Sequence, residues 1–192
     1  MKKLSLYIFL SFLWCNVGVA ECIKIQKPDL SSLNWTLVDE TIYENINLGI
    51  GLRYENYLGK SNLNYYSYNG GHTKIDETIL EKELHNAVDM AHKAFSMKDT
   101  YISNSDWRLV PEKIIQLTEG FLYNGVWSIV THKFLTGSWK SFTAITLGTN
   151  NNCIHKIRYT AALNAELTDP EAQIHEAMEN LFKIIIEIKL NK

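Results

Sequence analysis

The feature that most constrains this fold is a pair of strand-like segments between Trp139 and Leu163. Trp139–Leu147 and Cys153–Thr160 are rich in Ile, Thr and aromatic residues, and the polar segment Gly148–Asn152 separates them. β-Branched and aromatic residues favour strands, and a short polar segment between two strands favours a turn. We therefore predict a hairpin in the middle of an antiparallel sheet on which the rest of the chain packs.

A second hairpin is predicted nearer the N-terminus. Ile46–Tyr54 alternates large apolar residues with small or polar ones, which indicates a half-buried strand. Gly49 and Gly51 both lie on its other face, so we expect a bulge or another backbone close by. Asn56–Asn62 supplies the turn, and Leu63–Tyr68 forms the returning strand.

Three further segments have strand patterns. Thr36–Tyr43 is predicted to be a short edge strand, and Glu112–Leu117 is a strand candidate after the polar loop Ser96–Pro111. Val126–Leu135 carries large apolar residues on both faces, as expected for a central strand.

Two amphipathic helices complete the predicted fold. Either Asp76 or Thr78 caps a helix that runs to about Phe95 with one apolar stripe. Thr168–Glu171 marks the start of the last helix, because Pro170 suits the first turn and either Thr168 with Glu171, as a capping box, or Asp169 can cap it. We predict an α+β fold: an antiparallel sheet, made of the N-terminal hairpin and a C-terminal meander, with both helices packed on it.

The N-terminus reads as an export signal. Lys2 and Lys3 precede the apolar run Leu4–Trp14, and small residues precede the bond after Ala20. We expect residues 1–20 to be removed, residues 21–35 to form an extended arm and residues 36–192 to form one domain in the periplasm or outside the cell. No later segment is long and apolar enough to span a membrane.

Charge and cysteine content add two expectations. The formal net charge is −2, and loss of Lys2 and Lys3 would make it −4, so nucleic acid is not an expected partner. Cys22 and Cys153 would remain after cleavage. In an oxidising compartment they either form a disulfide or stay as two unpaired thiols.

Two stretches resemble a group of uncharacterised exported bacterial proteins. Leu48–Tyr54 and Tyr66–Gly71 match the strand motifs LGxxxxY and YxY(D/N)xG, and Lys156–Thr160 matches a terminal KIRxT strand. Ile154 and His155 depart from the apolar pattern of that last strand. The resemblance implies no activity. The order of elements also resembles a Mog1/PsbP-like arrangement or, alternatively, a profilin/PAS-like one.

The strand cations are the first candidate binding residues. Arg53, Lys156 and Arg158, with Tyr66 and Tyr68, would form a cationic and aromatic surface if one sheet face is open. Such a surface suits an anionic ligand: a lipid headgroup, a polysaccharide or a peptide carboxylate. The alternative is ordinary cross-strand pairing with acids such as Glu55.

A second candidate is a metal site on the first helix. His85, Asp89 and His92 share one helix face at spacings of four and three residues. The alternative is a solvated polar face. Cys153 and His155 lie two residues apart on one strand face, but no third group for a nucleophile is evident.

These observations favour a non-catalytic envelope protein that binds an anionic ligand or another envelope protein, with no cofactor. Two alternatives remain: a metal-assisted hydrolase using His85, Asp89 and His92, and a structural subunit of an envelope complex.

Overall fold

A computed structural model describes Cys22 and residues 27–58, 60–117, 122–134, 137–164 and 169–190. The predicted signal peptide lies outside these residues. The elements, in chain order, are η1 (Ser31–Leu33), β1 (Thr36–Ile42), η2 (Ile46–Leu48), β2 (Ile50–Asn56), β3 (Ser61–Tyr68), α2 (Glu77–Ser96), β4 (Tyr101–Asn104), β5 (Arg108–Leu109), α3 (Glu112–Leu117), β6 (Leu122–Phe134), β7 (Gly137–Asn150), β8 (Cys153–Leu163) and α4 (Pro170–Leu190).

The strands of the described residues form one eight-stranded antiparallel sheet. Its order is β1-β2-β3-β8-β7-β6-β4, with β5 also paired to β6. β7 and β8 form the predicted central hairpin, and its turn is only Asn151 and Asn152, both with positive φ. Asn tolerates that conformation, and two such residues suit a tight hairpin turn. The N-terminal hairpin joins the sheet through β3, which pairs with β8.

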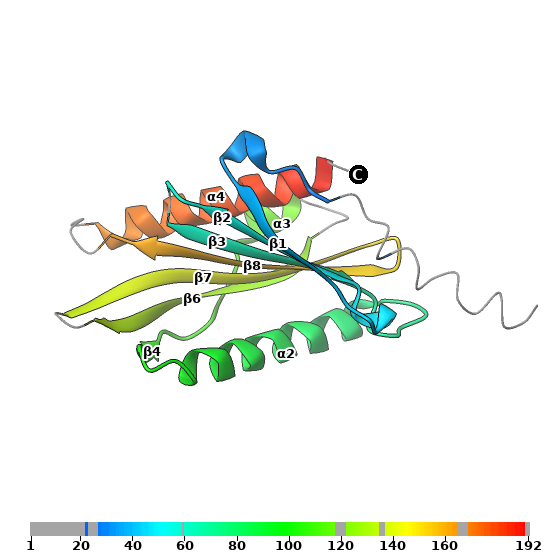
Figure 1. The fold of residues 1–192 in the computed structure, drawn as a ribbon, viewed down its shortest axis with the longest axis horizontal. Helices are drawn as coiled ribbons and strands as arrows, with labels where there is room; N and C mark the ends of the chain where they lie inside the picture. Colours follow the sequence, from blue (N-terminus) through cyan, green and yellow to red (C-terminus); the bar gives the residue numbers. More distant parts are fainter. Residues whose placement is uncertain are drawn as a thin grey trace, which may run out of the picture.

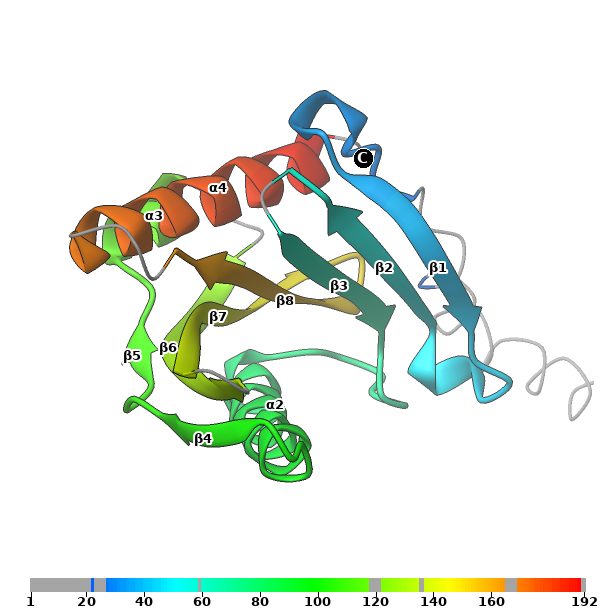
Figure 2. The same ribbon diagram turned by 60° about the vertical axis from the view of Figure 1, so that its left-hand side comes forward.

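One long helix covers each face of the sheet (Figure 1). α4 packs on the face that carries Ile157 and Tyr159, with Leu30 and Trp35 of the N-terminal arm completing that core. α2 packs on the other face through Leu84 and its apolar stripe. We call these the α4 face and the α2 face. α2 lies against β6 and β7, whereas β1 and β2 extend past it (Figure 2). The predicted α+β class is confirmed.

Both predicted helix starts are present. The Asp76 carboxylate accepts a hydrogen bond from the Ile79 amide at 3.1 Å, so Asp76 rather than Thr78 caps α2. The Asp169 carboxylate accepts from the Glu171 and Ala172 amides, each at 3.0 Å. These bonds satisfy backbone donors that no helical carbonyl can reach.

The first strand of the predicted N-terminal hairpin, Ile46–Tyr54, starts four residues later than expected. Ile46–Leu48 is a 3₁₀ turn with exposed apolar side chains, and β2 begins only at Ile50. Gly49 lies between them with a φ of +62°, and a Cβ there would stand 1.9 Å from the Ser67 carbonyl oxygen. The close backbone predicted from the glycines is therefore found at Gly49, where it also bends the chain.

The segment between the two helices differs most from prediction. Glu112–Leu117 is the helix α3, not a strand; its Glu, Lys, Gln and Leu residues favour helix, and Gln116 bonds back to Glu112. The predicted loop Ser96–Pro111 contains β4 and β5, which pair with β6. The described part of the N-terminal arm is not simply extended, since it contains η1 and buries Leu30 and Trp35.

Candidate functional site

A groove runs between α2 and the sheet. It consists of two hollows, of about 290 and 270 Å³, that share Arg158 as a lining residue. The first also contains Lys98, His132 and Trp139, and the second contains Tyr66 and Lys156. Among the described residues that line them, no acidic side chain occurs. We call the two hollows together the α2 groove.

Strand alternation in β8 brings the cations to this groove. Ile157 and Tyr159 point to the α4 face and are buried there, so Lys156 and Arg158 must point to the α2 face. Asn64 of β3 and Ile145 of β7 lie directly beside Arg158 in the pairing register. We expected these cations to form a binding surface if one sheet face is open. That face is only partly open, because α2 covers Lys156 and Arg158 to some extent.

Aromatic rings hold both cations in place. The Arg158 guanidinium carbon lies 5.0 Å from the Phe95 ring centre. The Lys156 ammonium nitrogen lies 5.0 Å from the Tyr66 ring centre and 5.2 Å from that of Tyr68. Contacts of this kind attract a cation to the face of a ring but leave its hydrogen-bond donors available to a ligand.

Burial disfavours the charged forms of Lys156 and Arg158. It lowers the pKa of Arg158 and the pKa of Lys156; nearby Glu83 partly offsets the effect on Lys156, while Arg158 reinforces it. Glu83 also accepts a hydrogen bond from the Tyr68 hydroxyl at 2.8 Å. Across the described residues, no carboxylate lies within 4.0 Å of Arg158 or Lys156. Arg158 is thus the less compensated of the two cations.

The far end of the groove is built around His132. Its Nε2 lies 3.1 Å from the Ser141 hydroxyl, and its ring stacks on Trp139 with ring centres 4.2 Å apart. Burial, followed by the positive charge of Lys98, lowers the pKa of His132. Sequence reasoning missed His132, Lys98 and Trp139 as groove residues, because only the strand order brings them near Arg158.

Of the other residues predicted to bind a ligand, some line the α2 groove and others lie outside it. Tyr66 lines the groove, whereas Tyr68 is engaged with Glu83 and Lys156. Arg53 lies in the same cross-strand row as Arg158 but two strands away, and it lines neither hollow. Its side chain is half-exposed and lies 3.9 Å from Glu55, the acid that the alternative named, but the two residues belong to the same strand and the contact is not a cross-strand pair.

The predicted metal ligands do not converge. His85 bonds to the Glu81 carbonyl, and His92 accepts a hydrogen bond from the Trp107 indole at 2.8 Å. Asp89 is exposed on α2. Across the part of the chain that the structure describes, no group of three or more His, Cys, Asp or Glu residues is arranged to hold a metal ion.

Cys22 and Cys153 form a disulfide, with Cα atoms 5.6 Å apart. Of the two alternatives for these cysteines, the disulfide is therefore the one present, and it fits an oxidising compartment. Of the helices described, none is both long and apolar enough to cross a membrane.

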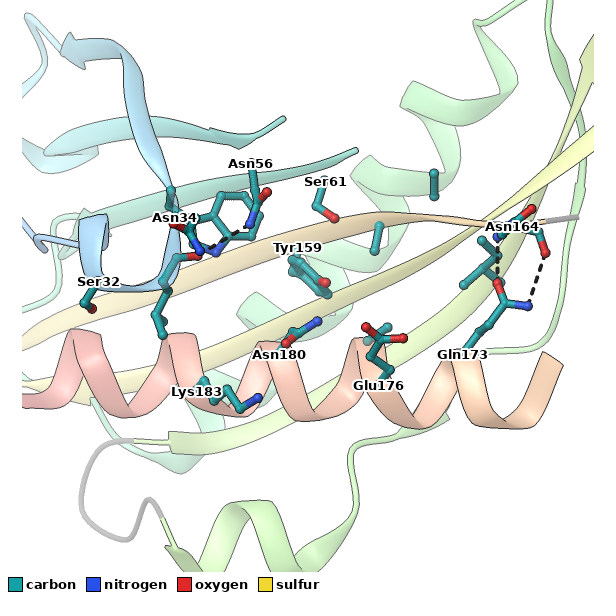
Figure 3. A pocket seen from close by; sticks show the side chains of 16 residues that line it. Ser32, Asn34, Asn56, Ser61, Tyr159, Asn164, Gln173, Glu176, Asn180 and Lys183 are labelled. Atoms are coloured by element: carbon teal, nitrogen blue, oxygen red, sulfur yellow. Dashed lines mark hydrogen bonds between the residues drawn. The ribbon is translucent and has the colours of Figure 1, made fainter. Parts of the chain in front are cut away.

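A separate cavity of about 410 Å³ lies on the α4 face, between α4, the η1 segment and the ends of β2, β3 and β8. Figure 3 shows Tyr159 between Ser61 and Asn180, with Glu176 and Lys183 projecting from α4. At one end, Gln173 bonds to the Asn164 backbone through both its oxygen and its nitrogen. Burial raises the pKa of Tyr159, whereas the hydrogen bonds of its hydroxyl with Ser61 and Asn180 lower it in part.

Comparisons with known proteins show a similarity in structure but none in sequence family. No protein-family model and no curated protein matches the sequence. Among solved structures, the chain is similar to a mutant of protein Mog1, with 10% identity and a TM-score of 0.39 over 73% of this chain and 77% of that chain. A Mog1/PsbP-like arrangement is one of those that the predicted order of elements resembles. Similarity at this level carries no inference about ligand or activity.

Proposed function

We propose that this chain is an exported, non-catalytic domain that binds a small anionic ligand in the α2 groove. The observation that carries the proposal is Arg158: a partly buried guanidinium, in a hollow without acidic side chains, with no carboxylate within 4.0 Å among the described residues. A cation withdrawn from water without an anionic partner costs free energy, and a bound anion would remove that cost.

The Phe95 ring compensates Arg158 only in part. A cation–π contact contributes about 0.5–2 kcal/mol, whereas desolvating an ion costs several kcal/mol. The planar guanidinium also presents paired donors that match a carboxylate or phosphate. An anion at Arg158 would lie near Lys98 in the first hollow and Lys156 in the second.

The second hollow supports a ligand that also has an apolar part. Small α2 side chains leave room there, and apolar atoms form much of its wall; the residues concerned are Ala87, Met90, Ala91, Ala94 and Ile145. Each methylene that the ligand buries in this hollow would add about 0.8 kcal/mol to binding.

The same groove gives little support to catalysis. Ser141 and His132 are paired as a nucleophile and a base would be, but Ser141 is only 1% exposed. Within the described chain, no carboxylate lies within 4.0 Å of His132 to orient its ring. A Ser–His pair without access or an orienting group lacks two requirements of nucleophilic catalysis.

Export forms the other half of the proposal. Residues 1–20 would act as a signal peptide cleaved after Ala20, and the Cys22–Cys153 disulfide supports an oxidising destination. Intact-mass measurement of the protein from a periplasmic fraction tests this half: a chain beginning at Glu21 supports it, and one that retains residues 1–20 contradicts it.

Calorimetric titration tests the groove. The probes are inorganic phosphate, octyl phosphate and vesicles containing phosphatidylglycerol. We expect octyl phosphate to bind at least about tenfold more tightly than phosphate, because two buried methylenes suffice for that factor. Binding to vesicles but not to octyl phosphate would indicate a membrane surface instead of an enclosed ligand.

Two arginine variants provide a matched pair for this titration. Arg158→Gln should weaken octyl phosphate binding at least about tenfold, because a charge-assisted hydrogen bond is lost. Arg53→Gln removes the same charge from the same cross-strand row but outside the groove, and binding should stay within about twofold. Equal losses in both variants, or no binding by the wild-type protein, would refute the proposal.

A further inference from the structure

The two hollows of the α2 groove follow one another along β8. Three successive pairs of β3 with β8 line them: Asn62 with Thr160, Asn64 with Arg158, and Tyr66 with Lys156. The first two pairs belong to the first hollow, and the third pair belongs to the second hollow. Successive pairs on one face of a sheet are about 7 Å apart. Because Arg158 lines both hollows, it stands at their junction and has a hollow on either side.

The accessible groups of the two hollows differ in chemistry. In the second hollow, Met90 is 64% exposed and Ala87 and Ala94 are half-buried, so α2 offers an apolar wall. In the first hollow, Asn62 is exposed and Asn64 is half-buried. Among the side-chain hydrogen bonds of the described residues, none involves either of these two amides. Such amides can donate to a ligand and accept from it, so the first hollow suits a hydroxylated group and the second an apolar chain.

The charge of the first hollow restricts that hydroxylated group further. Lys98 is exposed and lines this hollow together with Arg158, and His132 forms part of its wall. Among the described residues that line it, no carboxylate occurs. A cationic group such as choline would therefore meet like charge without an acidic partner, which costs free energy. An uncharged group such as glycerol avoids that cost.

We propose that the α2 groove binds an amphipathic phosphodiester. Its phosphate contacts Arg158, its apolar chain lies in the second hollow, and an uncharged hydroxylated arm lies against Asn62 and Asn64 in the first. The assignment rests on the function proposed above and names the class of ligand. A carboxylate or a phosphate monoester ends a chain and fills only one hollow, whereas a phosphodiester carries one group on each side of its charge.

Calorimetric titration with matched diesters tests the hydroxylated arm. Methyl octyl phosphate and glyceryl octyl phosphate carry the same single negative charge and the same chain, but only the second has hydroxyl groups. We expect the glyceryl diester to bind about tenfold more tightly, a factor that one or two hydrogen bonds supply. Octyl phosphocholine should bind at least about threefold more weakly than methyl octyl phosphate, because its cation meets Lys98.

The same titrations contain the results that would overturn this ligand class. A glyceryl diester that binds no more tightly than the methyl diester overturns it, and so does a choline diester that binds more tightly than the methyl diester. If octyl phosphate still binds in either case, the function proposed above stands without this ligand class. If neither octyl phosphate nor any diester binds, both fail.

Glyceryl methyl phosphate tests the apolar chain. It has the same charge and the same hydroxylated arm but lacks the octyl group. We expect it to bind at least about tenfold more weakly than glyceryl octyl phosphate, because the second hollow then buries no methylenes. Equal affinity would indicate a soluble phosphodiester in place of a lipid and would contradict the amphipathic ligand.

Asparagine variants locate the arm in the first hollow. Asn64→Ala and Asn62→Ala should each weaken glyceryl octyl phosphate about fivefold but leave methyl octyl phosphate within about twofold, because only the first ligand has hydroxyl groups to lose. Equal losses with both ligands would indicate a structural role and overturn the placement of the arm. Asn86→Ala, an exposed residue of α2 that lines neither hollow, is the matched control and should change neither affinity.

A lysine variant tests the exclusion of cationic arms. Lys98→Gln should narrow the difference in affinity between octyl phosphocholine and methyl octyl phosphate, because it removes the like charge that the choline group meets. An unchanged difference in this variant would contradict the placement of the arm beside Lys98.

Discussion

The two faces of the sheet use one strand in different ways. On the α4 face, β8 contributes Ile157 and Tyr159, both buried, to a core that also includes the N-terminal arm. On the α2 face, β8 contributes Ile154 to a second core, but the next alternating residues are Lys156 and Arg158, which lie against aromatic rings under a helix that covers part of the sheet. The comparison indicates that the α4 face supplies most of the stability, which leaves the α2 face free to carry groups that disfavour folding.

The disulfide should have the largest effect on stability. Cys153 lies on the α4 side of β8 and closes a loop with a sequence separation of 131 residues. Cys22→Ser with Cys153→Ser should lower the free energy of unfolding by about 5 kcal/mol, measured by urea denaturation, because the unfolded chain gains freedom. Wild-type protein unfolded under reducing conditions should match the double variant. A change below about 1 kcal/mol would show that this face does not depend on the bond.

Matched leucine truncations compare the two cores directly. Leu181 of α4 is 0% exposed and Leu84 of α2 is 7% exposed. Leu181→Ala should cost about 4 kcal/mol and Leu84→Ala about 3 kcal/mol in urea denaturation, since the more enclosed position leaves the larger cavity. If Leu84→Ala proves the more damaging change, the assignment of stability to the α4 face is wrong.

Acid should strengthen anion binding in the α2 groove. Burial and Lys98 lower the pKa of His132, so the folded protein keeps this ring neutral at pH values where the unfolded chain already protonates it. Its contribution to stability therefore falls as pH drops below about 6.5. Protonation of the folded ring, which requires a pH below about 6.5, adds a positive charge beside Arg158 and Lys98, and sulfate affinity should rise about fivefold as the pH falls through that range.

Sulfate keeps its charge over this range, so the protein alone accounts for any change. His132→Gln keeps a side chain that can bond to Ser141 and should remove most of the pH dependence. A pH profile that is unchanged in His132→Gln would assign the titration to another group and separate His132 from the ligand.

The helix caps give the smallest expected difference between the faces. Asp76 accepts a backbone hydrogen bond from Ile79 at the start of α2, and Asp169 accepts two, from Glu171 and Ala172, at the start of α4. Each Asp→Ala variant should lose about 1 kcal/mol of unfolding free energy, with Asp169→Ala the larger loss. Thermal unfolding of the two variants side by side measures the difference. A larger loss from Asp76→Ala would reverse the expected order of the two faces.

Sequence periodicity was enough to predict which residues of β8 lie on each face of the sheet and where the two long helices begin. Alternation in Cys153–Thr160 separated Lys156 and Arg158 from Ile157 and Tyr159, and the capping residues located both long helices. It failed at Glu112–Leu117, where a short apolar run did not distinguish a strand from a helix. At Ile46–Leu48, the strand pattern continued through a turn that only the backbone at Gly49 reveals.

The sites themselves depend on long-range pairing that no local pattern contains. Asn64 lies beside Arg158 only because β3 pairs with β8, although 94 positions separate the two residues in the sequence numbering. His132 and Lys98 reach the groove from β6 and from the end of α2. The cavity on the α4 face likewise joins Asn34, Asn56 and Asn180, none of which stands in a recognisable motif.

Replacing Arg158 by methionine tests the central claim most directly, with unfolding free energy and octyl phosphate affinity measured on the same preparation. Methionine keeps an extended side chain against Phe95 but removes the charge. The account predicts a free energy of unfolding within about 1 kcal/mol of wild type, because the lost cation–π contact is offset by the removed desolvation cost, together with at least a tenfold loss of affinity. A variant destabilised by about 3 kcal/mol or more that still binds octyl phosphate as tightly as wild type would contradict it, since Arg158 would then serve the fold and not a ligand.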